Sequence, residues 1–164
     1  MTVTYRVQQA GKLLGGTLSS AERAEVGPVL GPGLMQLFLR MGPLGQRHGY
    51  DVYRTLLAQG TRNADLLQAG LLHDVGKGRL GVPARALWVL LGAWRPELRQ
   101  SLASKPRLGH FLGLRTNLRH PEAGADAVAS AGGSSELVRL IRDHKQPQPQ
   151  DPLLRALQQA DDDN

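Results

Sequence analysis

The chain has 164 residues, a length typical of one domain around one hydrophobic core. It contains no cysteine, which excludes disulfides and thiolate metal sites, and no apolar run approaches the roughly 18 residues that span a bilayer. No secretion-signal pattern opens the sequence, so we expect a cytoplasmic protein. The net charge of +6 attracts phosphate-bearing partners such as nucleotides, nucleic acid or an anionic membrane surface, although few aromatic residues are present to stack on single strands.

The first 43 residues predict a helical lead-in that packs on the core of the domain. A short helix is expected around Tyr5–Leu14, within a glycine-rich stretch. Ser20 is suited to cap a helix over Ala21–Glu25, because its hydroxyl can accept a free backbone N–H group. Glycine and proline then separate this helix from another over Leu34–Leu39.

A helix is expected over Leu44–Gln59, where His48, Val52 and Leu56 recur every four residues. Residues with this spacing share one face of a helix. His48 is therefore predicted to point toward the core.

The central feature of the sequence is Leu71–Lys77, in which a nearly unbroken apolar run delivers His73 and Asp74 side by side. A helix starting at residues 61–63 would carry this pair near its end, with Gly76 suited to a left-handed cap. Burying an ionisable pair without partners costs several kcal/mol, so the pair either finds partners or binds a cation. We therefore interpret it as the centre of a metal site.

The second half of the chain is also helical in pattern, with Pro121 in the first turn of one helix. Trp88 and Trp94 are expected in core or edge packing. Residues 146–150 form a short Pro-Gln linker. The helices are expected at residues 83–92, 96–103, 108–114, 120–131, 135–144 and from 151 onward. No segment reads as a strand, so the sequence predicts an all-α fold.

Five of the expected helices bring a metal-competent side chain to their apolar face. A single histidine in such a place is usually a hydrogen-bonded core residue, but the same pattern on four helices favours a shared site. Leu157, four residues earlier, favours Asp161 over Asp162 as the last member. The predicted ligands are His48, His73, Asp74, His120, His144 and Asp161.

Imidazole and carboxylate groups suit divalent cations, with Mn or Fe expected first and Ni, Co, Zn or Mg as further options. A bridging carboxylate can hold two cations close together. Such a pair lowers the pKa of a bound water and polarises a phosphoryl oxygen for in-line attack. The expected nucleophile is then a metal-bridging hydroxide, and no serine or cysteine is required.

The order of these residues resembles the HD superfamily of metal-dependent phosphohydrolases, and His73-Asp74-Val75-Gly76-Lys77 resembles its HD-x-G-K subset. The resemblance covers most of the chain and implies an HD domain over residues 44–164. It implies that Asp74 is a catalytic residue and the bridging ligand. His120 and His144 correspond to the extra histidines of the two-metal branch.

The resemblance also implies that Lys77 lies near the substrate phosphate, as a catalytic and substrate-binding residue. Arg47 and Arg119 each adjoin a predicted ligand and are candidates for phosphate contacts. The expected substrate is a small phosphomonoester or phosphodiester, most simply of a nucleotide. Oligomeric state is left open.

The chain departs from the HD-GYP cyclic-dinucleotide phosphodiesterases after His144, where Lys145 and Gln146 lead into the Pro-Gln linker instead of the Gly-Tyr-Pro loop. The substrate class therefore stays open. Two other functions fit the same residues. One is a di-iron oxidoreductase that activates oxygen, and the other is a non-catalytic module that binds a nucleotide, RNA or protein.

Overall fold

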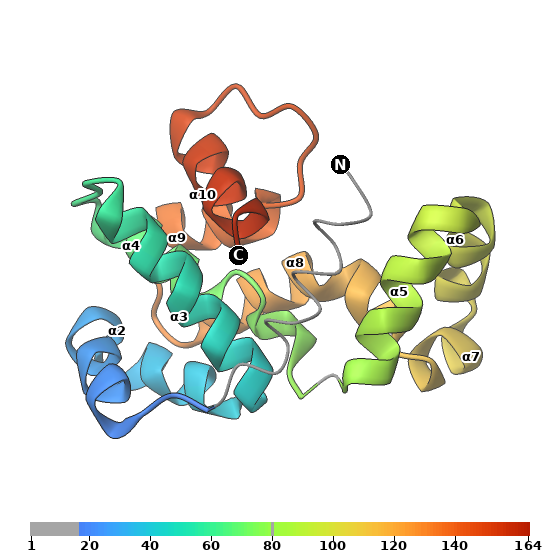
Figure 1. The fold of residues 1–164 in the computed structure, drawn as a ribbon, viewed down its shortest axis with the longest axis horizontal. Helices are drawn as coiled ribbons and strands as arrows, with labels where there is room; N and C mark the ends of the chain where they lie inside the picture. Colours follow the sequence, from blue (N-terminus) through green and yellow to red (C-terminus); the bar gives the residue numbers. More distant parts are fainter. Residues whose placement is uncertain (1–16, 80) are drawn as a thin grey trace.

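The computed structural model describes residues 17–79 and 81–164, and these residues form helices without any strand (Figure 1). The predicted all-α fold is thereby confirmed for the described part of the chain. The helix expected around Tyr5–Leu14 lies outside the described residues. Within the described ranges, no helix has both the length and the apolar character needed to cross a membrane.

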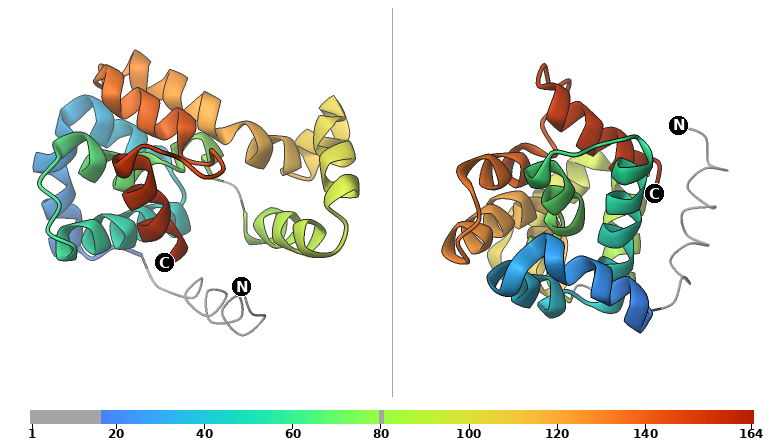
Figure 2. Two further views of the ribbon diagram at one scale, coloured as in Figure 1. Left: turned by 90° about the horizontal axis from the view of Figure 1, so that it is seen from above. Right: turned by 90° about the vertical axis from the view of Figure 1, so that its left-hand side faces the viewer.

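The helices divide into a bundle and a side projection (Figure 2). The projection consists of α5 (Val82–Trp94), α6 (Pro96–Ser104) and α7 (Pro106–Phe111), which we call the arm. The bundle contains α2 (Ser20–Arg40), α3 (Pro43–Ala58), α4 (Ala64–Leu72), the 3-10 turn η1 (Val75–Lys77), α8 (Leu114–Ser130), α9 (Ser135–Asp143) and α10 (Pro152–Asp162).

The two short helices expected in the N-terminal region are parts of one kinked helix, α2. Its backbone breaks at Gly31, where φ is 65°, between two prolines. The capping residue is Ser19, not Ser20. The Ser19 hydroxyl accepts the N–H of Glu22, and the Glu22 carboxylate accepts the N–H of Ser19 in return. This reciprocal cap fixes the start of the helix.

The segment after α4 differs from the expected left-handed cap at Gly76. Asn63 caps the start of α4 as expected, but Gly76 lies within η1 and the positive φ belongs to Gly78, at 55°. Gly76 is required for another reason. A Cβ atom there would overlap the carbonyl oxygen of His120, so its absence lets η1 lie directly against α8.

Helix α8 begins at Leu114, six residues before the predicted start at His120. Gly113, in the left-handed conformation, separates it from α7. Pro121 therefore lies inside the helix instead of in its first turn. A proline in that position has no N–H to give to the carbonyl four residues earlier, here that of Asn117.

The bundle has one hydrophobic core to which α2 contributes as fully as the later helices. Its fully buried members include Phe38, Leu71, Ile141 and Leu157. The predicted boundary between residues 43 and 44 falls at the start of α3. Among the described residues, no member of this cluster comes from the arm, whose buried Ala103 lies outside it.

Candidate metal centre

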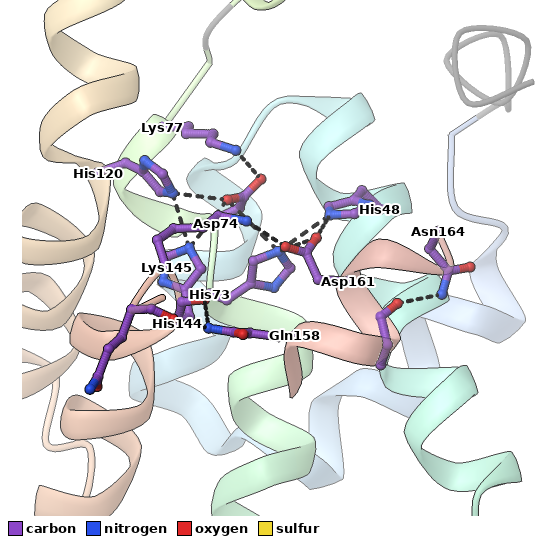
Figure 3. Close-up of polar contacts among 12 residues, drawn as sticks. His48, His73, Asp74, Lys77, His120, His144, Lys145, Gln158, Asp161 and Asn164 are labelled. Carbon is purple, nitrogen blue, oxygen red and sulfur yellow. Dashed lines mark hydrogen bonds and ion pairs between the residues drawn. The ribbon is translucent and has the colours of Figure 1, made fainter. Parts of the chain in front are cut away.

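All six predicted ligands converge at one place in the bundle (Figure 3). Three of them lie just outside a helix. His73 directly follows α4, Asp74 lies between His73 and η1, and His144 directly follows α9. The remaining three project from within α3, α8 and α10. His73, Asp74, His120 and His144 are buried, and the side chains of His48 and Asp161 are 23% and 14% exposed.

One half of the centre contains His48, His73 and Asp161. The Nε2 atoms of His48 and His73 are 3.2 Å apart, and Asp161 Oδ1 lies 2.9 Å from His48 Nε2 and 3.4 Å from His73 Nε2. Gly49 allows this approach, because a Cβ there would clash with the backbone of Leu71 on α4. Asp161 is thus the aspartate that reaches the histidines, in agreement with the Leu157 spacing.

The other half contains Asp74, His120 and His144. The Nε2 atoms of the two histidines are 3.0 Å apart. Asp74 Oδ1 lies 3.3 Å from His120 Nε2, 4.0 Å from His144 Nε2 and 3.7 Å from His73 Nε2. Two groups able to hold a cation are therefore present, His48-His73-Asp74 and Asp74-His120-His144, and they share Asp74.

The hydrogen bonds at Nδ1 determine which ring nitrogen faces the centre. His73, His120 and His144 each place Nδ1 against the carbonyl oxygen three residues earlier, at 3.1, 2.6 and 2.6 Å. A carbonyl can only accept, so Nδ1 carries the proton and a neutral ring directs its Nε2 lone pair into the centre. This is the arrangement in which histidine binds metals.

The carbonyls that orient these rings are free for local reasons. Gly70 and Ile141 lie in the last turns of α4 and α9, where helical carbonyls have no intrahelical donor. Asn117 lies in the first turn of α8, where its carbonyl would normally accept the N–H four residues later, but that N–H is missing from Pro121. Pro121 therefore leaves an acceptor for the Nδ1–H group of the residue before it.

His120 and His144 together fit a cation better than they fit each other. The Nε2 lone pairs of the two rings face each other at a distance of 3.0 Å, which is repulsive unless a proton or a cation lies between them. Burial lowers the pKa of His120, and burial followed by the charge of His73 lowers the pKa of His144 to about 2, so a proton is disfavoured. Two nitrogens about 2.1 Å from one cation lie about 3 Å apart when at right angles.

Asp74 is the second sign that this group could hold a cation. Burial alone would raise its pKa, but Lys77 and His73 hold that pKa well below the usual value, so the carboxylate is charged. Its Oδ2 atom accepts a hydrogen bond from Lys77 at 2.7 Å, whereas its buried Oδ1 atom has no hydrogen-bond partner among the described residues. A charged buried oxygen without a donor is costly unless a cation binds it.

The half with His48 and His73 is also suited to a proton. Burial alone would lower the pKa of His73, but the charges of Asp74 and Asp161 raise it, so this ring can carry a proton and a positive charge between two carboxylates. The donor set of imidazoles and carboxylates fits Mn, Fe, Co, Ni or Zn in both halves.

Three residues that the sequence did not single out support the centre. Lys145 contacts Asp161 Oδ2 at 2.5 Å, so each aspartate gives Oδ2 to a lysine and turns Oδ1 toward imidazoles. Gln158 donates to the carbonyls of His144 and Gln146 at 3.0 and 2.8 Å and fixes that segment against α10. Asn117 supplies the carbonyl for His120. For Lys145, the sequence offered one signal, its position directly after the predicted ligand His144.

The predicted substrate contacts have different positions. Lys77 lies at the centre, with its side chain 17% exposed. The Arg47 guanidinium lies between Glu22 and Asp51, 2.7 Å from each, and joins α2 to α3. Arg119 is exposed on α8, and no hydrogen bond or ion pair of the described residues joins it to the centre. Their roles toward a substrate stay predictions.

Comparisons with models of protein families, with curated proteins and with solved structures found no match for this chain. The chemistry of the centre is therefore inferred from its own residues. These residues form a buried, all-helical His/Asp site that could hold metal.

Proposed function

We propose that this protein is a metal-dependent phosphohydrolase of the HD superfamily with two divalent cations in its centre. The observation that carries the proposal is the pair of facing Nε2 atoms of His120 and His144 beside Asp74 Oδ1, a buried oxygen with no hydrogen-bond partner among the described residues. The order of the ligands along the chain, with His73-Asp74 followed by Gly76-Lys77, resembles that superfamily. The expected substrate is a small phosphomonoester or phosphodiester, most simply of a nucleotide.

The roles of the residues follow from their positions. Two cations at such a site supply an activated water and polarise a phosphoryl oxygen. His48, His73 and Asp161 would hold one cation, His120 and His144 the other, and Asp74 both. Lys77 is partly exposed beside Asp74 and would exchange part of that contact for a substrate phosphate oxygen, which fits a protein of net charge +6.

The test is hydrolysis of p-nitrophenyl phosphate, bis-p-nitrophenyl phosphate and a set of nucleotides by protein loaded with Mn or Fe. We expect turnover that chelation abolishes and that His144→Ala lowers at least a hundredfold. His110→Ala is the matched control, because His110 is an exposed histidine of the arm. This variant should retain wild-type activity.

The same assay separates the alternatives. Redox-dependent spectra and oxygen consumption by the iron-loaded protein, without phosphate release, would indicate the di-iron oxidoreductase. The non-catalytic module would be indicated if the wild type binds nucleotide without any turnover and the His73→Ala/Asp74→Ala double variant still binds it. Either result would contradict the phosphohydrolase.

A further inference from the structure

The arm presents apolar side chains to solvent. Seven large hydrophobic residues are exposed in the described part of the chain, and six of them lie on the arm. Trp94 and Phe111 are 78% and 85% exposed, so Trp94 does not have the packed position expected from the sequence. The other four are Val89, Leu90, Leu98 and Leu108. Single exposed hydrophobic residues are common, whereas six within one three-helix segment favour a role in binding.

The arm is also strongly basic. Residues 82–111 contain five arginines and lysines and one acidic residue, a net charge of +4. Arg95, Lys105 and Arg107 are exposed, and Arg95 and Arg107 directly adjoin Trp94 and Leu108. Positive charge thus lies next to exposed apolar groups at the joints between the helices.

Arg99 has a different role within the arm. Its guanidinium lies over the ring of Trp88, 4.3 Å from the ring centroid, and against Gly92. It therefore joins α6 to α5. Trp88 is only partly exposed, so the two tryptophans differ, with Trp88 stabilising the arm and Trp94 facing solvent.

We propose that the arm docks on an anionic membrane surface. Leucine, tryptophan and phenylalanine side chains beside lysine and arginine are the composition of helices that lie in the interface of a bilayer. Apolar insertion and attraction to anionic headgroups are the two signals that such binding combines. At 13 residues, or about 20 Å, α5 is too short for the roughly 30 Å hydrocarbon core, so it would lie on the membrane.

Charge and composition favour a membrane over two other occupants. A second copy of the chain would bring the same net charge of +4 against this one, which is repulsive. A nucleic acid would neutralise the basic residues, but its phosphates and sugars would not bury four exposed aliphatic side chains. An anionic bilayer satisfies both groups of residues. The inference is independent of the proposed activity.

The test is cosedimentation of the full chain with vesicles of phosphatidylcholine, with and without phosphatidylglycerol. We expect binding to the anionic vesicles that weakens as salt rises and that falls about tenfold or more in Trp94→Ser with Phe111→Ser. Leu39→Ser is the matched control, because Leu39 is a large exposed hydrophobic residue outside the arm, on α2. It should bind as the wild type does. Unchanged metal content and melting temperature verify that each variant is folded.

Three results would overturn the proposal. The first is absence of binding to anionic vesicles, and the second is equal binding to neutral ones. The third is a dimer in light scattering that the Trp94/Phe111 variant dissociates, without vesicle binding by the wild type. This last result would assign the arm to contact between copies of the chain.

Discussion

The two phenylalanines of the chain lie in opposite surroundings. Phe38 on α2 is fully buried in the bundle, whereas Phe111 on α7 is 85% exposed on the arm. The bundle also encloses polar residues, His73 and Asp74, whereas no arm residue in the described part of the chain belongs to the bundle's hydrophobic cluster. The bundle is thus built around an internal ionic centre, and the arm directs its apolar groups outward. The first is suited to chemistry and the second to attachment.

The largest effect expected from this contrast is on stability. Phe38→Ala should lower the free energy of unfolding by about 4 kcal/mol, because it leaves a cavity in a close-packed core. Phe111→Ala should change it by no more than about 0.5 kcal/mol. Urea unfolding of both variants measures the difference. Equal losses would mean that the arm is packed as tightly as the bundle.

The next effect concerns the shared carboxylate. Asp74→Asn removes the charge that faces three imidazoles and Lys77, and it should reduce bound metal to one equivalent or fewer. The loss of a buried ion pair should also lower stability by about 3 kcal/mol. Elemental analysis and urea unfolding measure the two effects. Asp126→Asn, an exposed aspartate of α8, is the control and should change neither.

Pro121→Ala should change stability and metal affinity in opposite directions. Alanine restores an N–H group inside α8 and should stabilise the protein by about 1–3 kcal/mol. That N–H competes with His120 for the Asn117 carbonyl, so metal affinity should fall about tenfold. Metal titration and thermal unfolding test both. Pro152→Ala, in the first turn of α10, is the control and should have little effect on stability or metal affinity. Unchanged metal affinity in Pro121→Ala would show that Pro121 does not help to orient His120.

The smallest effect is expected for Arg47→Gln. Because Arg47 joins α3 to α2 through Glu22 and also pairs with Asp51 on its own helix, the variant should lose about 1 kcal/mol of stability with no change in metal content or KM. Arg119→Gln, on the exposed face of α8, should keep wild-type stability. A KM that rises in Arg47→Gln alone would instead support the sequence-based role of Arg47 in binding substrate.

The sequence predicted the helices and the convergence of the six candidate ligands because both follow from spacing. Residues four apart, such as His48 and Val52, share a helix face whatever the tertiary arrangement. The sequence did not predict that Arg47 pairs with Glu22, 25 positions earlier, since such pairing depends on how α2 packs on α3. Nor did it predict the exposure of Trp94, because an apolar pattern does not reveal whether a neighbouring element covers it.

The start of α8 illustrates a different limit. Proline is usual in a first helical turn, so His120-Pro121 reads locally as a helix start. The structure extends the helix back to Leu114, and the missing N–H becomes useful at the centre. The added turns bury Leu114 and Asn117, and such burial depends on neighbouring helices that the local sequence does not reveal.

We propose that the bundle holds two cations that share Asp74. Elemental analysis of protein incubated with Mn and freed of excess metal, compared with the His120→Ala/His144→Ala variant, tests this stoichiometry. We expect two equivalents in the wild type and one in the variant, held by His48, His73, Asp74 and Asp161. No bound metal in the wild type, or two equivalents in the variant, would contradict the two-cation centre.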